Sequence, residues 1–122
     1  MGTFHTACRV ENITDGLRRI RVPELLVDRG SEFTWISSAQ LNRIGIKREK
    51  KDMPFIMANG QTATRSVGFA IIRVGKHFTI DEVVFAEPGD LALLGARTLE
   101  GLNLVVYAAH KRLLATGPLP AA

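Results

Sequence analysis

The pair Asn59-Gly60 constrains the fold of this chain more strongly than any other feature. Asn-Gly between two apolar or β-branched segments is the strongest short-range signal for a β-hairpin. The flanking segments here are residues 54–58 and 62–67, and both have the composition of strands. The sequence therefore predicts an antiparallel hairpin whose tip is Asn59-Gly60.

Short apolar or β-branched segments separated by turn residues make up most of the remaining chain, and this is the signature of an all-β protein. Asp15-Gly16 and residues 75–77 supply two further turns. Further strands are accordingly predicted at residues 3–10, 17–27, 32–36, 69–74, 78–85, 102–107 and 112–115.

Two short helices are predicted between these strands. Ser37 followed three residues later by Gln40 forms a capping box. Gly45 stands where a left-handed residue would end that helix. The second helix is expected at residues 96–100 and would stop at Gly101. The prediction is one mostly-β domain with two short helices.

Size and composition narrow the class of protein. A chain of 122 residues suits one domain with a modest core, and an apolar fraction of 46% is that of a packed protein. No apolar stretch approaches the roughly 20 residues that span a bilayer, and residues 1–5 lack the features of a signal peptide. Cys8 is the only cysteine, so no internal disulfide points to an oxidising compartment. We expect a cytoplasmic protein with no membrane partner.

The formal net charge of +4 raises the question of nucleic acid binding, since residues 47–51 concentrate part of it. No aromatic RNA-binding signature, zinc-ligand spacing or basic recognition helix accompanies this run. We interpret the run as a solvated loop after a helix and predict no nucleic acid partner.

The apolar residues 25–27 run directly into Asp28-Arg29-Gly30-Ser31. An acid at the end of a buried strand is costly unless it is hydrogen-bonded, paired or used in function. Asp28 is therefore the main candidate for a functional residue. The structural alternative is an aspartate that forms a turn or caps a helix.

This segment resembles the active-site strand of the retropepsin-like aspartic proteases, whose signature is an apolar run, Asp, Thr or Ser, Gly and a small residue. Two further landmarks of that family follow in the same order. A flap-like hairpin falls at Asn59-Gly60, and an apolar-apolar-Gly segment falls at residues 93–95. The chain resembles the small predicted aspartyl proteases of bacteria more than the viral ones.

The resemblance extends from about residue 3 to residue 114. It implies a retropepsin-like closed β-barrel protomer, the acid protease fold, with two short helices. The implied domain is residues 1–116, and residues 117–122 are expected to form a flexible tail.

Proteolysis by aspartates needs two carboxylates flanking one water, one ionised as base and the other protonated as acid. This chain has a single Asp-x-Gly in that setting, because Asp15 lies in a polar turn and Asp90 in a loop. The second acid must therefore come from a second copy of the chain. A homodimer with the site on its two-fold axis follows, since a symmetric interface brings identical residues together.

The resemblance also implies roles for the residues around Asp28. Gly30 would let the backbone turn sharply and approach the substrate, and the Ser31 hydroxyl would bond the outer oxygen of Asp28. The other implied positions are a substrate contact at Glu32, the flap tip at Asn59 and Gly60, and packing behind the active site at Leu94 and Gly95.

Arg29 departs from the family pattern, which has Thr or Ser at this position. That hydroxyl bonds across the dimer axis, and an arginine has no acceptor and keeps its charge, so it cannot copy the exchange. Arg29 can turn outward and leave a weakened dyad, pair with Asp28 of the other chain in an inactive dimer, or prevent the dimer. Our hypothesis is that fold and dimer persist while peptidase activity near neutral pH is reduced or absent.

The sequence therefore predicts an aspartic-type endopeptidase that acts on peptide or protein substrates as a homodimer. The alternative is a catalytically dead relative that binds peptides or proteins in the same groove, and a third option is a domain that serves only in assembly. No metal or cofactor is predicted, because His5, His77 and His110 lack metal-ligand spacing and Cys8 lies in a strand without an oxyanion turn.

Overall fold

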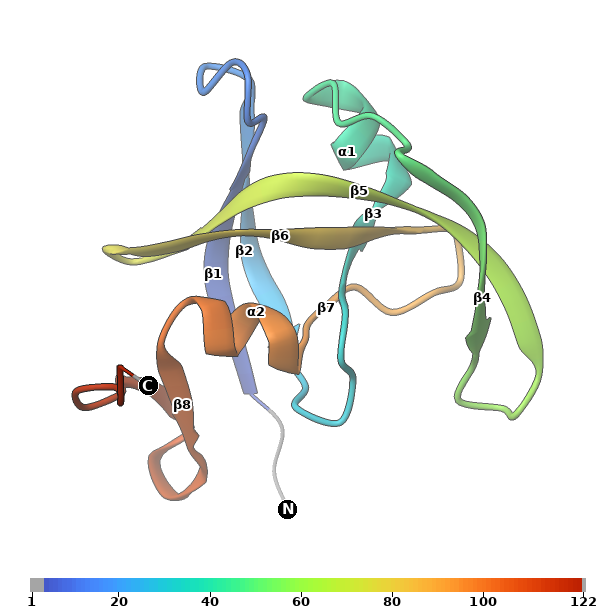
Figure 1. Ribbon diagram of the computed structural model, residues 1–122. Helices are drawn as coiled ribbons and strands as arrows, with labels where there is room; N and C mark the ends of the chain where they lie inside the picture. Colours follow the sequence, from blue (N-terminus) through green and yellow to red (C-terminus); the bar gives the residue numbers. More distant parts are fainter. Residues whose placement is uncertain (1–3, 122) are drawn as a thin grey trace.

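The computed structural model describes residues 4–121, which fold mainly into β-strands (Figure 1). The expected mostly-β architecture with two short helices is confirmed, and the strand position predicted at residue 3 lies outside the described residues. In chain order the elements are β1 (Phe4–Glu11), β2 (Arg19–Val27), β3 (Thr34–Ser37), α1 (Ser38–Arg43), β4 (Lys50–Ile56), β5 (Thr62–Val74), β6 (His77–Ala86), β7 (Leu93–Leu94), α2 (Ala96–Gly101), β8 (Leu104–Tyr107), the 3₁₀ turn η1 (Ala108–His110) and β9 (Arg112–Ala115).

Within residues 4–121, six strands close into a ring. The large sheet has the order β1-β2-β7-β3-β6-β5-β4, and an additional antiparallel pairing of β1 with β5 joins the ring. β4 pairs with β5 outside the ring, and β8 with β9 forms a separate two-stranded sheet. The fold is therefore the expected all-β arrangement in the form of a ring-like sheet.

The larger hydrophobic cluster draws on strands all around this ring. Val10, Ile36, Ile72, Phe85 and Leu94 are fully buried in it and come from five different strands. Side chains on a strand alternate between two faces, which explains why the members from β6 are Val83 and Phe85 and those from β5 are Ala70 and Ile72. Burial of each such side chain stabilises the folded state by roughly 1.5–3 kcal/mol. This cluster holds the strands of the ring together, and the loops extend from these strands.

The sequence prediction that residues 62–74 form two strands divided at Gly68 is wrong. β5 runs unbroken through Gly68, which pairs with Val83 of β6. A Cβ at this position would overlap the carbonyl oxygen of Lys47 and press on the ring of Phe85. Gly68 therefore marks the close approach of two backbones and not the end of a strand.

The basic run at residues 47–51 is also only partly the loop that the sequence predicts. β4 begins at Lys50, which pairs with Val67 of β5. The Arg48 guanidinium lies over the ring of Phe85, 4.3 Å from its centroid. The run therefore attaches β4 to the sheet, because strand pairing reaches further back along the chain than the charge pattern indicates.

The local signals for helices and the central hairpin are confirmed. The Ser37 hydroxyl accepts from the backbone N–H of Gln40 at 3.3 Å, and Gly45 follows α1 with a left-handed φ of 75°. At the hairpin tip, Gly60 has a φ of 84° and its N–H donates to the carbonyl of Met57 at 2.8 Å. No helix in the described range 4–121 has the length and apolar character needed to cross a membrane.

Candidate active site

Asp28 emerges from the end of β2 at a point where three strands meet. β7 lies between β2 and β3, parallel to β2 and antiparallel to β3. Val27 pairs in register with Leu94, and the Asp28 N–H donates to the Leu94 carbonyl at 3.0 Å. The segment at residues 93–95 thus lies directly behind the Asp28 loop, the position that the family resemblance implies.

The loop after Asp28 rests on the backbone that leaves β7. The N–H of Ala96 donates to the Ser31 carbonyl at 2.8 Å, and the N–H of Arg97 donates to the Glu32 carbonyl at 3.0 Å. A Cβ at Gly95 would overlap the carbonyl of Phe33, so only glycine fits between these two segments. Two backbone hydrogen bonds and one close approach therefore hold the loop.

A buried chain of hydroxyl groups braces the same junction. The Gly95 N–H donates to Thr34 Oγ1 at 2.9 Å, Thr34 Oγ1 lies 2.6 Å from Thr98 Oγ1, and Thr98 Oγ1 donates to Asp81 Oδ2 at 2.8 Å. Each hydroxyl has one hydrogen. Because the hydroxyl hydrogen of Thr98 is donated to Asp81, the Thr34 hydroxyl is the donor in its hydrogen bond with Thr98. The sequence alone gives no signal for these hydrogen bonds, since their members lie on three separate segments, β3, β6 and the start of α2.

Asp28 is half-buried, and its carboxylate Oδ1 accepts from the Gly30 N–H at 2.9 Å. The Ser31 hydroxyl donates to the Phe33 carbonyl at 3.0 Å, and not to Asp28 as the resemblance implies. Within residues 4–121, Asp28 forms no ion pair, and the exposed Arg29 forms neither an ion pair nor a side-chain hydrogen bond. The Oδ2 of Asp28 has no hydrogen-bond partner among the described residues and is not a fully buried atom.

A second hydrophobic cluster connects this loop with the β4–β5 hairpin. The ring of Phe55 on β4 meets Phe33 and Trp35 edge-on, with centroids 5.6 and 5.2 Å apart. Met57, beside the hairpin tip, packs against the same cluster. Figure 1 shows the hairpin tip and the β2–β3 loop at the lower end of the view. Asn59 and Gly60 are exposed at that tip.

A bidentate ion pair holds the other strand of the hairpin. Arg65 Nε and Nη2 donate to Asp90 at 2.7 and 2.9 Å, and both side chains are largely buried. The hydrogen bond from Arg65 lowers the pKa of the Asp90 carboxyl below its usual range. Asp90 therefore has a structural role as the partner of Arg65. Asp15 lies in the β1–β2 turn, where its carboxylate accepts from the Leu17 N–H. Neither acid is bonded to Asp28.

A model of the gag-polyprotein putative aspartyl protease family matches residues 21–101, which is more than half of the chain. The chain belongs to this family. The matched span contains Asp28, the Asn59-Gly60 hairpin and Gly95. Among curated proteins, none matches the chain. The aspartyl protease resemblance deduced from the sequence is thus confirmed by the family model and by a mostly-β structure.

The other reactive side chains of this aspartyl protease family member form no hydrogen bond or ion pair with Asp28 within residues 4–121. Burial raises the pKa of the Cys8 thiol to about 12, so the thiol stays protonated and is a poor nucleophile. His5, His77 and His110 belong to β1, β6 and η1. Within the described residues, no group of three His, Cys, Asp or Glu side chains is arranged to hold a metal ion.

Proposed function

We propose that this protein is an aspartic-type endopeptidase whose active unit is a homodimer, with one Asp28 from each copy. The observation that carries this proposal is the Asp28 loop itself, a half-buried aspartate at the end of β2 whose Oδ2 has no hydrogen-bond partner among the described residues and whose backbone is held by β7. A loop fixed in this way positions a reacting group without further reorganisation. The family match supports the same reading.

The chemistry requires both copies. One Asp28 carboxylate would take a proton from a water molecule as that water attacks the peptide carbonyl carbon. The other, protonated, would first hydrogen-bond the carbonyl oxygen and then supply a proton as the C–N bond breaks and the amine leaves. Two like charges in contact favour sharing one proton between them, so a symmetric pair can hold both roles at once.

In our proposal, Arg29 lowers the peptidase activity of the dimer. Its side chain is exposed beside Asp28, so a two-fold axis at this loop brings two guanidiniums close to two carboxylates. Their positive charge favours two ionised carboxylates and disfavours the shared proton. We propose that the fold and the dimer persist and that cleavage near neutral pH is weak or absent.

The substrate in this proposal is an extended peptide or an unfolded protein segment. Its backbone would run between the Asp28 loop and the hairpin, with Glu32 on one side and the Asn59-Gly60 tip on the other. Both Glu32 and the tip are exposed, so they are accessible to such a ligand. We further propose a cytoplasmic location, which suits a chain whose one cysteine is a free, buried thiol.

Cleavage of an unstructured protein between about pH 4 and 7 tests the proposal. We expect Arg29→Thr to cut faster than the natural chain, and Asp28→Asn in that background to abolish cutting. Asp52→Asn is the matched control, because Asp52 is exposed on β4 with a φ of 55°, which asparagine tolerates. Cleavage that survives Asp28→Asn would refute Asp28 as the catalytic residue.

The second candidate is a catalytically inactive member of the family that binds peptides or proteins in the same groove. The exposure of Arg29 favours it, since a guanidinium with no ion pair among residues 4–121 is available to bind a ligand carboxylate. The two candidates differ at this residue. Arg29→Thr raises cleavage if the protein is a peptidase and weakens peptide binding, without cleavage, if it is a binding module.

A further inference from the structure

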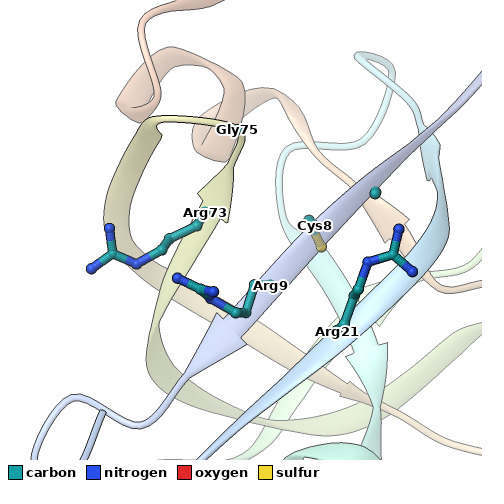
Figure 2. A pocket seen from close by; sticks show the side chains of 6 residues that line it. Cys8, Arg9, Arg21, Arg73 and Gly75 are labelled. Atoms are coloured by element: carbon teal, nitrogen blue, oxygen red, sulfur yellow. The ribbon is translucent and has the colours of Figure 1, made fainter. Parts of the chain in front are cut away.

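A row of arginines crosses three neighbouring strands at a distance from the Asp28 loop. Arg9 of β1 pairs in register with Arg21 of β2 on one side and with Arg73 of β5 on the other. Directly opposed residues of antiparallel strands share a face, and like charges at such positions destabilise a sheet. Figure 2 shows Arg9 between Arg73 and Arg21. The chain thus retains an unfavourable arrangement of charge at this position.

These arginines line a hollow in the surface of the protein. Its volume is about 220 Å³, well above the space that a single water molecule needs. None of the described residues that line it is an acid. The lining residues are Ala7, Cys8, Arg9, Arg21, Arg73 and Gly75.

Glu11 compensates only part of this charge. Its nearly buried carboxylate accepts from Arg9 Nε at 2.7 Å and from Arg73 Nε at 2.9 Å, both at Oε2. Each of these guanidiniums donates to Glu11 through one of its five N–H groups, so others remain available. Arg21 has no ion pair within residues 4–121. Three guanidiniums against one carboxylate leave an excess of positive charge at the hollow.

We propose that this hollow binds a small multivalent oxyanion of the phosphate class, for which inorganic pyrophosphate is the simplest probe. A guanidinium fork matches phosphate oxygens in a bidentate geometry. The three arginines occupy paired positions on adjacent strands, so a small ligand with several charges can contact more than one of them. An extended acidic peptide carries single charges on one face only about every 6.5 Å.

The site is independent of the proposed catalytic centre. Arg21 precedes Asp28 by seven residues along β2 and its following loop. At about 3.3 Å per residue this separation is about 23 Å along the strand. Loss of anion binding and loss of cleavage can therefore be observed separately.

Calorimetric titration of the full chain with pyrophosphate at about 0.15 M salt tests the proposal. Arg21→Gln is the decisive variant, because Arg21 is exposed and its removal leaves the Glu11 ion pairs intact. We expect it to weaken binding by about tenfold or more, as the loss of a charged hydrogen bond does. Arg43→Gln on α1 removes the same charge elsewhere and should change the affinity by less than about twofold.

Two further variants test the competition from the Glu11 carboxylate and the need for the guanidinium group of Arg21. Glu11→Gln removes the competing carboxylate and should tighten pyrophosphate binding, whereas Arg21→Lys keeps the charge without the fork and should weaken it. No binding by the natural chain would overturn the proposal. So would equal weakening by Arg43→Gln and Arg21→Gln, or binding of an acidic peptide in place of pyrophosphate.

Discussion

Replacement of Thr34 by valine isolates the hydroxyl chain behind the Asp28 loop. Valine has nearly the same shape as threonine, so no cavity forms and only the hydrogen bonds are lost. Thr34 is fully buried, and its Oγ1 accepts from the Gly95 N–H and donates to Thr98. A buried N–H left without a partner costs about 1–3 kcal/mol, and the lost bond to Thr98 adds about 0.5–1.5 kcal/mol. We expect the free energy of unfolding to fall by about 2–4 kcal/mol.

Urea denaturation followed by the fluorescence of Trp35, the single tryptophan, measures this change. The matched control is Thr62→Val, because Thr62 is exposed on β5 and should change stability by no more than about 0.5 kcal/mol. Thr98→Val should cost less than Thr34→Val, since Asp81 is half-exposed and can bond water in its place. Equal midpoints for Thr34→Val and Thr62→Val would refute the reasoning.

Three shorter predictions follow from other contacts. Gly95→Ala should prevent stable folding because its Cβ overlaps a backbone carbonyl, whereas Gly16→Ala, with open space around it, should be nearly neutral in the same denaturation assay. Asp90→Asn should lower the unfolding free energy by about 1–2 kcal/mol at neutral pH. Because the folded pKa of Asp90 is lowered, the stability that Asp90 contributes is present above the ordinary carboxyl pKa and disappears as pH falls through the lowered value, so titration from pH 7 to 2 should bring the two proteins together. The Cys8 thiol, with its pKa raised to about 12, should react with a thiol reagent at pH 8 only in urea, and rapid reaction in the native protein would contradict its burial.

The sequence predicts those parts of the fold that depend on local signals. The hairpin at Asn59-Gly60 and the cap at Ser37 are properties of a few neighbouring residues, and both are found where expected. The order of landmarks also predicted that residues 93–95 would pack behind Asp28. This prediction drew on the family resemblance, because nothing local in residues 93–95 indicates their partner.

The contacts that sequence reasoning missed join residues far apart along the chain. Thr34 and Thr98 are 64 positions apart, and neither differs locally from an ordinary threonine. At Gly68 the sequence predicted the end of a strand where the strand continues. A glycine inside a strand pattern indicates a break unless the neighbouring backbone is known. The Ser31 hydroxyl turns to the Phe33 carbonyl, since that acceptor lies two residues away in the same loop.

The central claim, that two Asp28 carboxylates act together, is tested most directly by mixing chains. Arg29→Thr chains would be combined with an equal amount of chains that carry both Arg29→Thr and Asp28→Asn, and cleavage would be measured per chain that retains Asp28. If each site needs one Asp28 from each copy, random pairing leaves about half of the Asp28-containing chains in mixed, inactive dimers, and cleavage per such chain falls to about half. Unchanged cleavage per Asp28-containing chain, or no cleavage by Arg29→Thr alone, would contradict a dyad shared across the dimer.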